Sequence, residues 1–170
     1  MISFRNVVED DFITLHNWLK VPHVKEYWYQ TESFTYEEIC KKYSKRLKKG
    51  IVELYIIQKN GKDIGFIQTY IIDEPTAFMV KDKIKGIDLY IGEVDYIHKG
   101  YGKDIIDNFV INYIFNDKSI RFAGIDPEVE NVIAIKAYKK SGFKHVNTEY
   151  SKYNKNMTYY MILDRFDKNL

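Results

Sequence analysis

The sequence predicts an α/β domain of the α+β type, with a mixed sheet of about seven strands and helices on both faces. Segments rich in β-branched and aromatic residues alternate with segments whose apolar residues recur every third or fourth position. A hairpin signal comes early, a strand–helix–strand–helix unit follows, and a second hairpin closes the chain. The chain has 170 residues and no Pro/Gly/Ser-rich linker, so we expect residues 1–170 to form a single domain.

The N-terminal segment is expected to form a strand and then a helix. Residues 1–6 read as a short strand, and the apolar residues after it recur at helical spacing, which predicts a helix over about 9–20. Pro22 stops this helix because its ring cannot continue the hydrogen-bond ladder. The segment 24–30 then places three aromatic residues in a row, Tyr27, Trp28 and Tyr29, and we expect a short turn or helix there.

A second helix and a hairpin follow. Thr35 and Glu38 stand at the spacing of a capping box, which predicts that a helix starts here, and Gly50 marks the end of that helix. Two strands are then predicted, over 51–58 and 64–72. Asn60-Gly61 lies between them, and this dipeptide is the strongest short-range signal for a tight hairpin turn.

The second half of the chain alternates strands and helices. Ile87, Leu89 and Ile91 alternate with Asp88 and Tyr90, so the strand that holds them places Asp88 and Tyr90 on one face. Periodicity and turn residues predict a strand over 86–92, a helix over 105–114, a strand over 119–125, a helix over 131–141 with Gly142 as its cap, and a closing hairpin over 143–149 and 157–163.

Composition excludes several classes of function. The sequence has 26 Lys and Arg residues against 24 Asp and Glu, and a net charge of +2 does not favour nucleic-acid binding, which needs a strongly basic face. The single cysteine, Cys40, excludes an internal disulfide framework, and the four histidines show no metal-ligand spacing, so no metal is expected. No secretory signal or membrane-spanning run is recognised. We therefore expect a cytoplasmic protein, monomeric or homodimeric, that acts on a small molecule without a membrane partner.

A glycine-rich segment precedes the helix predicted at 105–114. It reads His98-Lys99-Gly100-Tyr101-Gly102-Lys103. The backbone N–H groups of such a loop, together with a helix N-terminus, can form a cradle for an anion. The segment does not continue as the dinucleotide-binding fingerprint and lacks the Ser/Thr of a P-loop, so nucleotide-binding folds of those types are disfavoured. Taken alone, it is a weak signal, and a flexible turn that enters a helix is the favoured interpretation.

A second motif lies further along, around the helix predicted at 131–141. It consists of Asp126-Pro127, Asn131, Ala134, Ala137 and Tyr138. The small alanine side chains allow the helix to approach the sheet or a ligand closely. Tyr138 falls on the same helix face as Asn131 and Ala134, because residues three, four and seven positions apart are neighbours on a helix surface.

With both motifs in place, the sequence resembles the GNAT superfamily of acyl-CoA N-acyltransferases, over about residues 2–164 and most specifically over 86–143. The resemblance implies a sheet splayed into a V between the strands at 86–92 and 119–125, with the pantetheine arm of acetyl-CoA in the splay. It implies that the loop from His98 to Lys103 holds the pyrophosphate by backbone N–H groups, while Lys99 and Lys103 add positive charge. It also implies that Asn131 bonds the pantetheine amides and that Tyr138 lies near the thioester sulfur.

A more specific resemblance is to the aminoglycoside 6′-N-acetyltransferases. It rests on Gly86-Ile87-Asp88, Ile91-Gly92-Glu93, Lys99-Gly100-x-Gly102 and Asp126-Pro127, and on the earlier Trp18-Leu19, Pro22-His23-Val24, Glu26 and Trp28. In that family the aspartate at the position of Asp88 is the proposed general base, and the one at Asp126 binds the amino sugar. The resemblance therefore implies antibiotic resistance by acetylation.

The chemistry of acetyl transfer gives three side chains a role, each with an alternative. A carboxylate that binds an ammonium can also accept its proton, directly or through water, and Asp88 fits this role unless it is solvated or paired with a lysine. Tyr138 fits a proton donor to the departing thiolate, since tyrosine and thiol have ordinary pKa values of about 10 and about 8.5; the alternative is a core tyrosine. Trp28 fits stacking on a sugar ring, or equally a place in the core.

The charge pattern indicates the substrate class. Residues 86–97 and residues 122–131 each hold three acidic residues and no Lys or Arg, whereas residues 35–50 carry a net +4. Acidic segments beside the expected splay favour a cationic acceptor such as an aminoglycoside. Other acceptors stay open, namely a siderophore hydroxylamine, a streptothricin-like compound, a polyamine or a protein N-terminus. A non-catalytic acyl-CoA-binding domain is the alternative from a different class.

Overall fold

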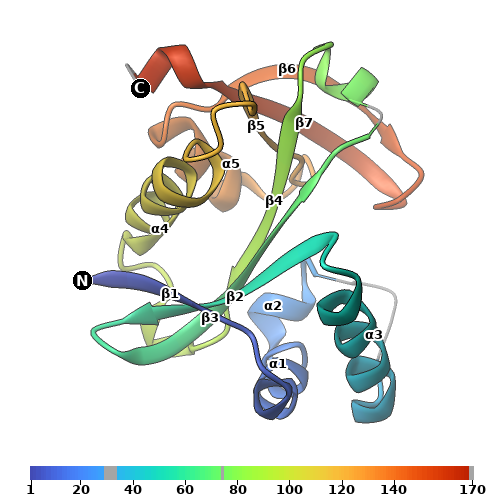
Figure 1. Ribbon diagram of the computed structural model, residues 1–170, viewed down its shortest axis with the longest axis vertical. Helices are drawn as coiled ribbons and strands as arrows, with labels where there is room; N and C mark the ends of the chain where they lie inside the picture. The colour runs from blue at the N-terminus through green and yellow to red at the C-terminus, as the bar shows by residue number, and fades with distance from the viewer. Residues whose placement is uncertain (29–33, 74, 169–170) are drawn as a thin grey trace. The chain divides into compact units, whose positions relative to one another are not determined.

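The computed structural model describes residues 1–28, 34–73 and 75–168 (Figure 1). Tyr29 and Gln30, which belong to the predicted aromatic segment, lie outside these residues. Seven strands are present in the described ranges: β1 Ile2–Asn6, β2 Val52–Lys59, β3 Lys62–Ile71, β4 Ile84–Ile91, β5 Phe122–Ile125, β6 Lys144–Ser151 and β7 Asn156–Asp164. The α-helices are α1 Phe12–Trp18, α2 Pro22–Lys25, α3 Tyr36–Lys49, α4 Tyr101–Phe109 and α5 Val132–Lys140. Short helical turns lie at Glu9–Asp11, Pro75–Phe78, Val94–Tyr96 and Arg165–Lys168.

The strands form one mixed sheet in the order β1-β2-β3-β4-β5-β7-β6, which confirms the predicted fold class. β4 and β5 pair in parallel, with Ile84 opposite Phe122 and Gly86 opposite Gly124, and α4 lies between them in the sequence. β1 pairs with β2, β2 with β3, β5 with β7 and β6 with β7, all antiparallel. A parallel pair needs a crossover connection, and this is the one that the strand–helix–strand pattern predicted.

Local signals placed the turn and the caps correctly. Asn60 and Gly61 both have positive φ, 52° and 80°, as a tight turn between β2 and β3 requires. Thr35 accepts a hydrogen bond from the Glu38 backbone N–H at 3.2 Å, and the Glu38 carboxylate accepts one from the Thr35 N–H at 2.8 Å. Both bonds of the predicted capping box are therefore present. Gly50 ends α3 with a φ of 62°.

Three elements differ most from their predicted bounds. The helix predicted over 9–20 is a 3-10 turn followed by the shorter α1. The helix predicted over 105–114 changes at Val110 into a π-helical turn, in which the Phe115 N–H donates to the Val110 carbonyl. This wider turn allows Val110, Ile114 and Phe115 all to be buried, which a regular α-helix would place further apart around its axis. β5 starts at Phe122 rather than at 119.

The described residues fall into two compact units. The first is Met1–Tyr70 with Asp88–Lys99, and the second is Ile71–Ile87 with the chain from Gly100 onward. β4 therefore gives its first half to the second unit and its second half to the first. The expectation of a single domain stays a prediction.

In the first unit, α1, α2 and α3 pack on the sheet through an aromatic core (Figure 1). Its buried members are Val7, Phe12, Leu15, Trp18, Val24, Ile39, Tyr43, Leu54, Ile56, Phe66 and Tyr90. Tyr43 of α3 meets Phe66 of β3 nearly edge to face, with ring centroids 5.7 Å apart. Much of the aromatic excess of the sequence is thus used in packing.

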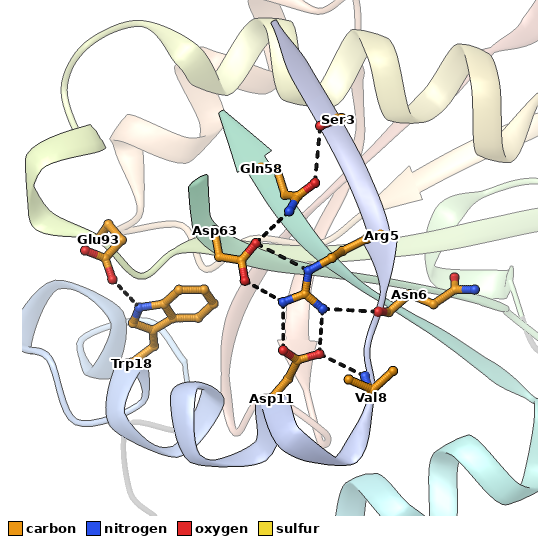
Figure 2. Close-up of polar contacts among 9 residues, drawn as sticks. All are labelled: Ser3, Arg5, Asn6, Val8, Asp11, Trp18, Gln58, Asp63 and Glu93. Carbon is orange, nitrogen blue, oxygen red and sulfur yellow. Dashed lines mark hydrogen bonds and ion pairs between the residues drawn. The ribbon is translucent and has the colours of Figure 1, made fainter. Parts of the chain in front are cut away.

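An ion-pair network fixes the start of α1 to the sheet (Figure 2). Arg5 on β1 donates to both oxygens of Asp11, at 2.8 and 2.7 Å, and also pairs with Asp63 on β3. Asp11 in turn accepts from the Val8 backbone N–H at 2.8 Å. The bonds to Asp11 and Asp63 raise the pKa of Arg5 above its ordinary value. The charge of Arg5 is thus paired with two carboxylates, and the network connects β1, β3 and the first helical turn.

In the second unit, α4 and α5 lie side by side (Figure 1). A Cβ built on Gly102 of α4 would lie 3.6 Å from the Cβ of Ala137 in α5, so the helices meet through two small residues. The buried Arg165 donates to the Phe115 carbonyl at 2.7 Å and ties the C-terminal turn to the segment after α4.

Candidate active site

Asp88 lies in the half of β4 that belongs to the first unit, and two side chains of β3 hold its carboxylate. Gln68 Nε2 donates to Oδ2 at 2.7 Å, and the Tyr70 hydroxyl donates to Oδ1 at 3.3 Å. Residues two positions apart on a strand share a face, so Gln68 and Tyr70 reach Asp88 from the same side of the sheet. The carboxylate is therefore oriented through both of its oxygens.

The environment of Asp88 makes it a stronger base than an ordinary aspartate. Removal from water raises the pKa of this carboxyl, while the hydrogen bonds from Gln68 and Tyr70 and the positive charge of Arg46 act in the opposite direction. The net effect is a raised pKa. A general base works best when its pKa approaches the operating pH, so the shift suits proton abstraction near neutrality.

Sequence reasoning did not find Gln68, Tyr70 or Arg46. Arg46, in the last turn of α3, donates from Nη1 to Gln68 Oε1 at 2.6 Å. Gln68 is only 5% exposed and lies on β3 among buried apolar residues. A buried amide in such a strand needs polar partners. A glutamine within an apolar strand was therefore the sequence signal that could have pointed to this site. The identity of those partners depends on the tertiary fold.

Trp28 lies in the aromatic core on the same face as the carboxylate. Its ring meets Tyr90 edge to face, with centroids 4.8 Å apart, and Tyr90 shares a face of β4 with Asp88. A second edge contact joins Trp28 to Phe66 at 6.0 Å. The Trp28 side chain is half-buried. Of the two roles that the sequence left open, the place in the core is therefore present. Its contact with a sugar stays a prediction.

The glycine-rich loop contains two residues with a left-handed backbone conformation. His98 and Gly100 both have positive φ, 58° and 81°, and α4 begins directly after them at Tyr101. No side chain caps this helix end, since Gly100 stands at the N-cap. The first N–H groups of a helix have no partner within the helix, and Gly100 offers them no capping side chain.

The two loop lysines differ in their partners. Lys103 forms an ion pair with Asp107 one turn further along α4, and the hydrogen bond to Asp107 raises the pKa of Lys103. Asp107 also pairs with Lys168 at 3.1 Å. Lys99 lies with its ammonium 5.9 Å from the centre of the Tyr96 ring. The predicted positive charge is present at both positions, but a carboxylate already neutralises part of it at Lys103.

Asn131 and Tyr138 both take structural positions in α5. Asn131 is the N-cap, and its Oδ1 accepts from the Ala134 N–H at 3.2 Å, which leaves the amide NH₂ outside this bond. Tyr138 is 8% exposed, with its ring centroid 6.1 Å from that of Phe143. Gly142, with a φ of 93°, follows the end of the helix. The expected contacts of Asn131 and Tyr138 with acetyl-CoA stay predictions.

Asp126 follows β5 in an acidic region of the second unit. Its Oδ2 accepts from Asn154 Nδ2 at 3.3 Å, and Glu128 accepts from Asn156 Nδ2 at 2.9 Å. Burial, joined by the negative charges of Asp126 and Glu149, raises the pKa of Tyr160. The negative charge of Asp126 is therefore one of the influences on the neighbouring Tyr160.

The structure groups the predicted site residues by unit. Asp88 and Trp28 both lie in the first unit, which also includes His98 and Lys99. The second unit holds Gly100, Tyr101, Gly102 and Lys103 at α4, Asn131 and Tyr138 on α5, and Asp126 after β5.

Across the described ranges, no three His, Cys, Asp or Glu side chains gather in a way that could hold a metal ion. No helix within residues 1–28, 34–73 and 75–168 is long and apolar enough to span a membrane.

The mixed sheet with its parallel β4 and β5 pair, and the glycine-rich loop before the crossover helix α4, fit an acyltransferase fold of the acyl-CoA-dependent class. A family model described as an acetyltransferase (GNAT) domain matches residues 7–149, and the chain belongs to this family. The family relation confirms the resemblance seen in the sequence.

Curated relatives and solved structures extend the comparison. The aminoglycoside N(6′)-acetyltransferases type 1 of Klebsiella pneumoniae and Serratia marcescens are each 27% identical over 153 residues, which cover 86% of this chain and 76% of theirs. A crystal structure of aminoglycoside acetyltransferase AAC(6′)-Ib with coenzyme A has a TM-score of 0.86 at 25% identity, covering 99% of this chain and 98% of that one. The same enzyme with ribostamycin and coenzyme A gives 0.86 at 26% identity, covering 99% and 96%.

Proposed function

We propose that the protein transfers the acetyl group of acetyl-CoA to the 6′-amine of aminoglycosides. The observation that carries the proposal is Asp88, an oriented carboxylate with a raised pKa on β4 of an acetyltransferase fold. Relatives named as aminoglycoside N(6′)-acetyltransferases support the acceptor, and the solved complexes of AAC(6′)-Ib with coenzyme A support the donor. Acetylation of these antibiotics would confer resistance.

Asp88 has a defined task in this reaction. It binds the substrate ammonium and accepts its proton, directly or through water, which frees the nitrogen lone pair. The nitrogen then bonds to the thioester carbonyl carbon and the carbon–sulfur bond breaks. The nitrogen gives its second proton to water, which leaves the neutral amide, and the departing thiolate takes up a proton. Tyr138 is the proposed donor of that proton, since its ordinary pKa of about 10 lies only slightly above the thiol value of about 8.5. Water restores both groups to their starting states.

The donor contacts follow from the glycine loop and α5. The N–H groups between His98 and Lys103 suit the pyrophosphate, because backbone donors and a helix N-terminus both favour negative charge. Asn131 keeps an amide NH₂ for the pantetheine arm while its oxygen caps α5. The Gly102 and Ala137 contact keeps α4 and α5 close without bulky side chains near this helix end.

The two loop lysines should contribute unequally to acetyl-CoA affinity. We expect Lys99→Gln to weaken acetyl-CoA binding about threefold or more, and Lys103→Gln to weaken it by about twofold or less, because Asp107 already neutralises part of the Lys103 charge. Isothermal titration calorimetry at low ionic strength measures both dissociation constants. Equal losses for the two variants, or a larger loss for Lys103→Gln, would contradict this assignment.

Acidic groups and one aromatic ring support a cationic sugar as the acceptor. Asp126 is proposed to bind an ammonium of the amino sugar, and Trp28 to contact a sugar ring with its accessible part. Acetylation removes one positive charge from the acceptor. The product is therefore held less strongly by the acidic groups than the substrate, which favours its release.

A thiol-release assay tests the proposed function. Acetyl-CoA turnover is expected with aminoglycosides that carry a 6′-amine and is expected to be at background with matched 6′-hydroxyl compounds. The 6′-hydroxyl compound is the internal control, because it has the same rings and nearly the same charge. Equal rates with both would exclude the 6′-amine as the acceptor. Turnover only with a polyamine, a hydroxylamine or a peptide N-terminus would assign another amine, and no thiol release with any amine would indicate a binding domain.

A further inference from the structure

We propose that Arg46 is a positioning residue for acetyl transfer, which acts through Gln68 to hold Asp88 in the orientation and ionisation state of a base. The inference rests on the proposed function, since it concerns the same carboxylate. Arg46 lies on α3, about 40 residues before Asp88 in the sequence, and is outside both motifs that indicated the activity. Arg46 contacts Gln68, which in turn contacts the carboxylate.

The geometry is a continuous chain of hydrogen bonds. Arg46 Nη1 donates to Gln68 Oε1 at 2.6 Å, and Gln68 Nε2 donates to Asp88 Oδ2 at 2.7 Å. Both contacts have the short length that is typical of bonds to charged groups. The amide between them is 5% exposed, so water has little access to compete for its two ends.

The chemistry of the two neighbours permits only one amide orientation. A guanidinium can only donate hydrogen bonds, and an ionised carboxylate can only accept them. With Oε1 toward Arg46 and Nε2 toward Asp88, both ends of Gln68 are satisfied. A flipped amide would place NH₂ against the guanidinium and its oxygen against the carboxylate. Arg46 thus selects the orientation in which Gln68 favours the ionised form of Asp88.

Packing holds Arg46 in place for this task. Its guanidinium lies 5.7 Å from the centre of the Tyr43 ring, one turn earlier on α3, and Tyr43 is fully buried against Phe66 of β3. Among the described residues, no carboxylate forms an ion pair with Arg46. Its charge is therefore available to the Gln68 amide and, at longer range, to Asp88.

The groups that face Asp88 determine the expected response. They are Gln68 and Tyr70 from β3 and Arg46 from α3, and all three lower the pKa of Asp88 against the effect of burial. Loss of Arg46 removes a positive charge and releases the amide. Both effects favour the protonated carboxyl, so the pKa of Asp88 should rise and the acidic limb of the rate profile should move to higher pH.

The test compares Arg46→Gln with Arg46→Lys and with Lys45→Gln. Lys45 is an exposed neighbour on α3, so its replacement removes the same charge without touching Gln68. The pKa of Asp88 is measured from its side-chain carbon signal by NMR, assigned with Asp88→Asn. Arg46→Gln is expected to raise the pKa of Asp88 by about half a unit to one unit. Arg46→Lys is expected to keep this pKa close to the wild-type value, and Lys45→Gln to leave it unchanged.

Kinetics supply a second readout. At neutral pH, Arg46→Gln should lower kcat about tenfold while the KM for acetyl-CoA stays at the wild-type value, and activity should recover partly as the pH is raised. An Asp88 pKa in Arg46→Gln equal to the wild-type value would overturn the proposal. An equal shift in Lys45→Gln would also overturn it, because a general charge effect would then suffice.

A double-mutant cycle with Gln68→Leu tests whether Arg46 acts through the amide. If it does, the shift in the double variant is smaller than the sum of the two single shifts. Additive pKa shifts would overturn the proposal that Arg46 acts on Asp88 through Gln68. Thermal unfolding of each variant confirms that the compared proteins are folded. The NMR titration needs no substrate, so failure of aminoglycoside turnover would refute the proposed function alone, while an unmoved pKa would refute the role of Arg46 alone.

Discussion

Replacing Asp88 with asparagine is expected to lower kcat for acetyl transfer by about two to four orders of magnitude. Asparagine has nearly the same shape as aspartate, and its oxygen can still accept the hydrogen bond from Gln68 or Tyr70. It cannot take a proton from an ammonium, and it removes the negative charge that binds that ammonium. The loss should therefore fall on the chemistry rather than on the fold.

Two measurements separate these effects. Steady-state thiol release gives kcat, and calorimetry gives the affinity for acetyl-CoA, which should stay close to the wild-type value because the donor is proposed to bind at the glycine loop and α5. Asp73→Asn is a suitable control, since Asp73 is exposed and outside both motifs. Retention of most of the wild-type kcat in Asp88→Asn would remove this carboxylate from the mechanism.

The parts of the fold that the sequence predicted correctly depend on residues close together in the chain. The Thr35 and Glu38 capping box and the Asn60-Gly61 turn each involve at most four consecutive positions, and both are present. Strand alternation likewise placed Asp88 and Tyr90 on one face. Such signals are encoded by local sterics and hydrogen bonding, so one sequence suffices to detect them.

The features of the site and the fold that the sequence did not predict depend on residues that are distant in the chain. Gln68 and Arg46 come from other elements than Asp88, and only the pairing of β3 with β4 and the packing of α3 bring them to the carboxylate. The π-helical turn at Val110 is a further case, because burial of Phe115 together with Ile114 is a tertiary requirement. Periodicity alone predicts a regular helix there.

Some predicted site residues also carry local structural tasks that the sequence could have indicated. Asn131 stands at the N-cap of α5, a position where asparagine is favoured, and Lys103 and Asp107 have the spacing of a helix ion pair. These tasks do not exclude binding. They mean that replacing Asn131 affects both helix stability and donor binding, whereas replacing Asp88 tests the chemistry more directly.

Gly65→Ala is expected to be the most destabilising single replacement in the sheet that supports Asp88. A Cβ at this position of β3 would lie 2.3 Å from the Tyr90 carbonyl oxygen and 2.9 Å from the Ile91 Cα. Both are backbone atoms, so no side chain can move aside. The adjacent Ile64 carbonyl accepts hydrogen bonds from the Gly92 and Glu93 N–H groups at 2.8 and 3.1 Å, which hold the two segments together.

Alanine at position 65 must therefore push the second half of β4 away from β3. We expect the free energy of unfolding to fall by about 3 kcal/mol or more, and kcat to fall as well, because the displaced segment includes the carboxylate that Gln68 and Tyr70 orient. Urea unfolding followed by fluorescence measures the change. Gly61→Ala is the matched control: Gly61 has a φ of 80° but nothing within 4 Å of its Cβ position, so only the backbone conformation is disfavoured, at about 1 kcal/mol. Equal losses for the two variants would show that β3 and β4 separate at Gly65 at no greater cost than the backbone strain at Gly61, and the rigid support assigned here to Asp88 would then be wrong.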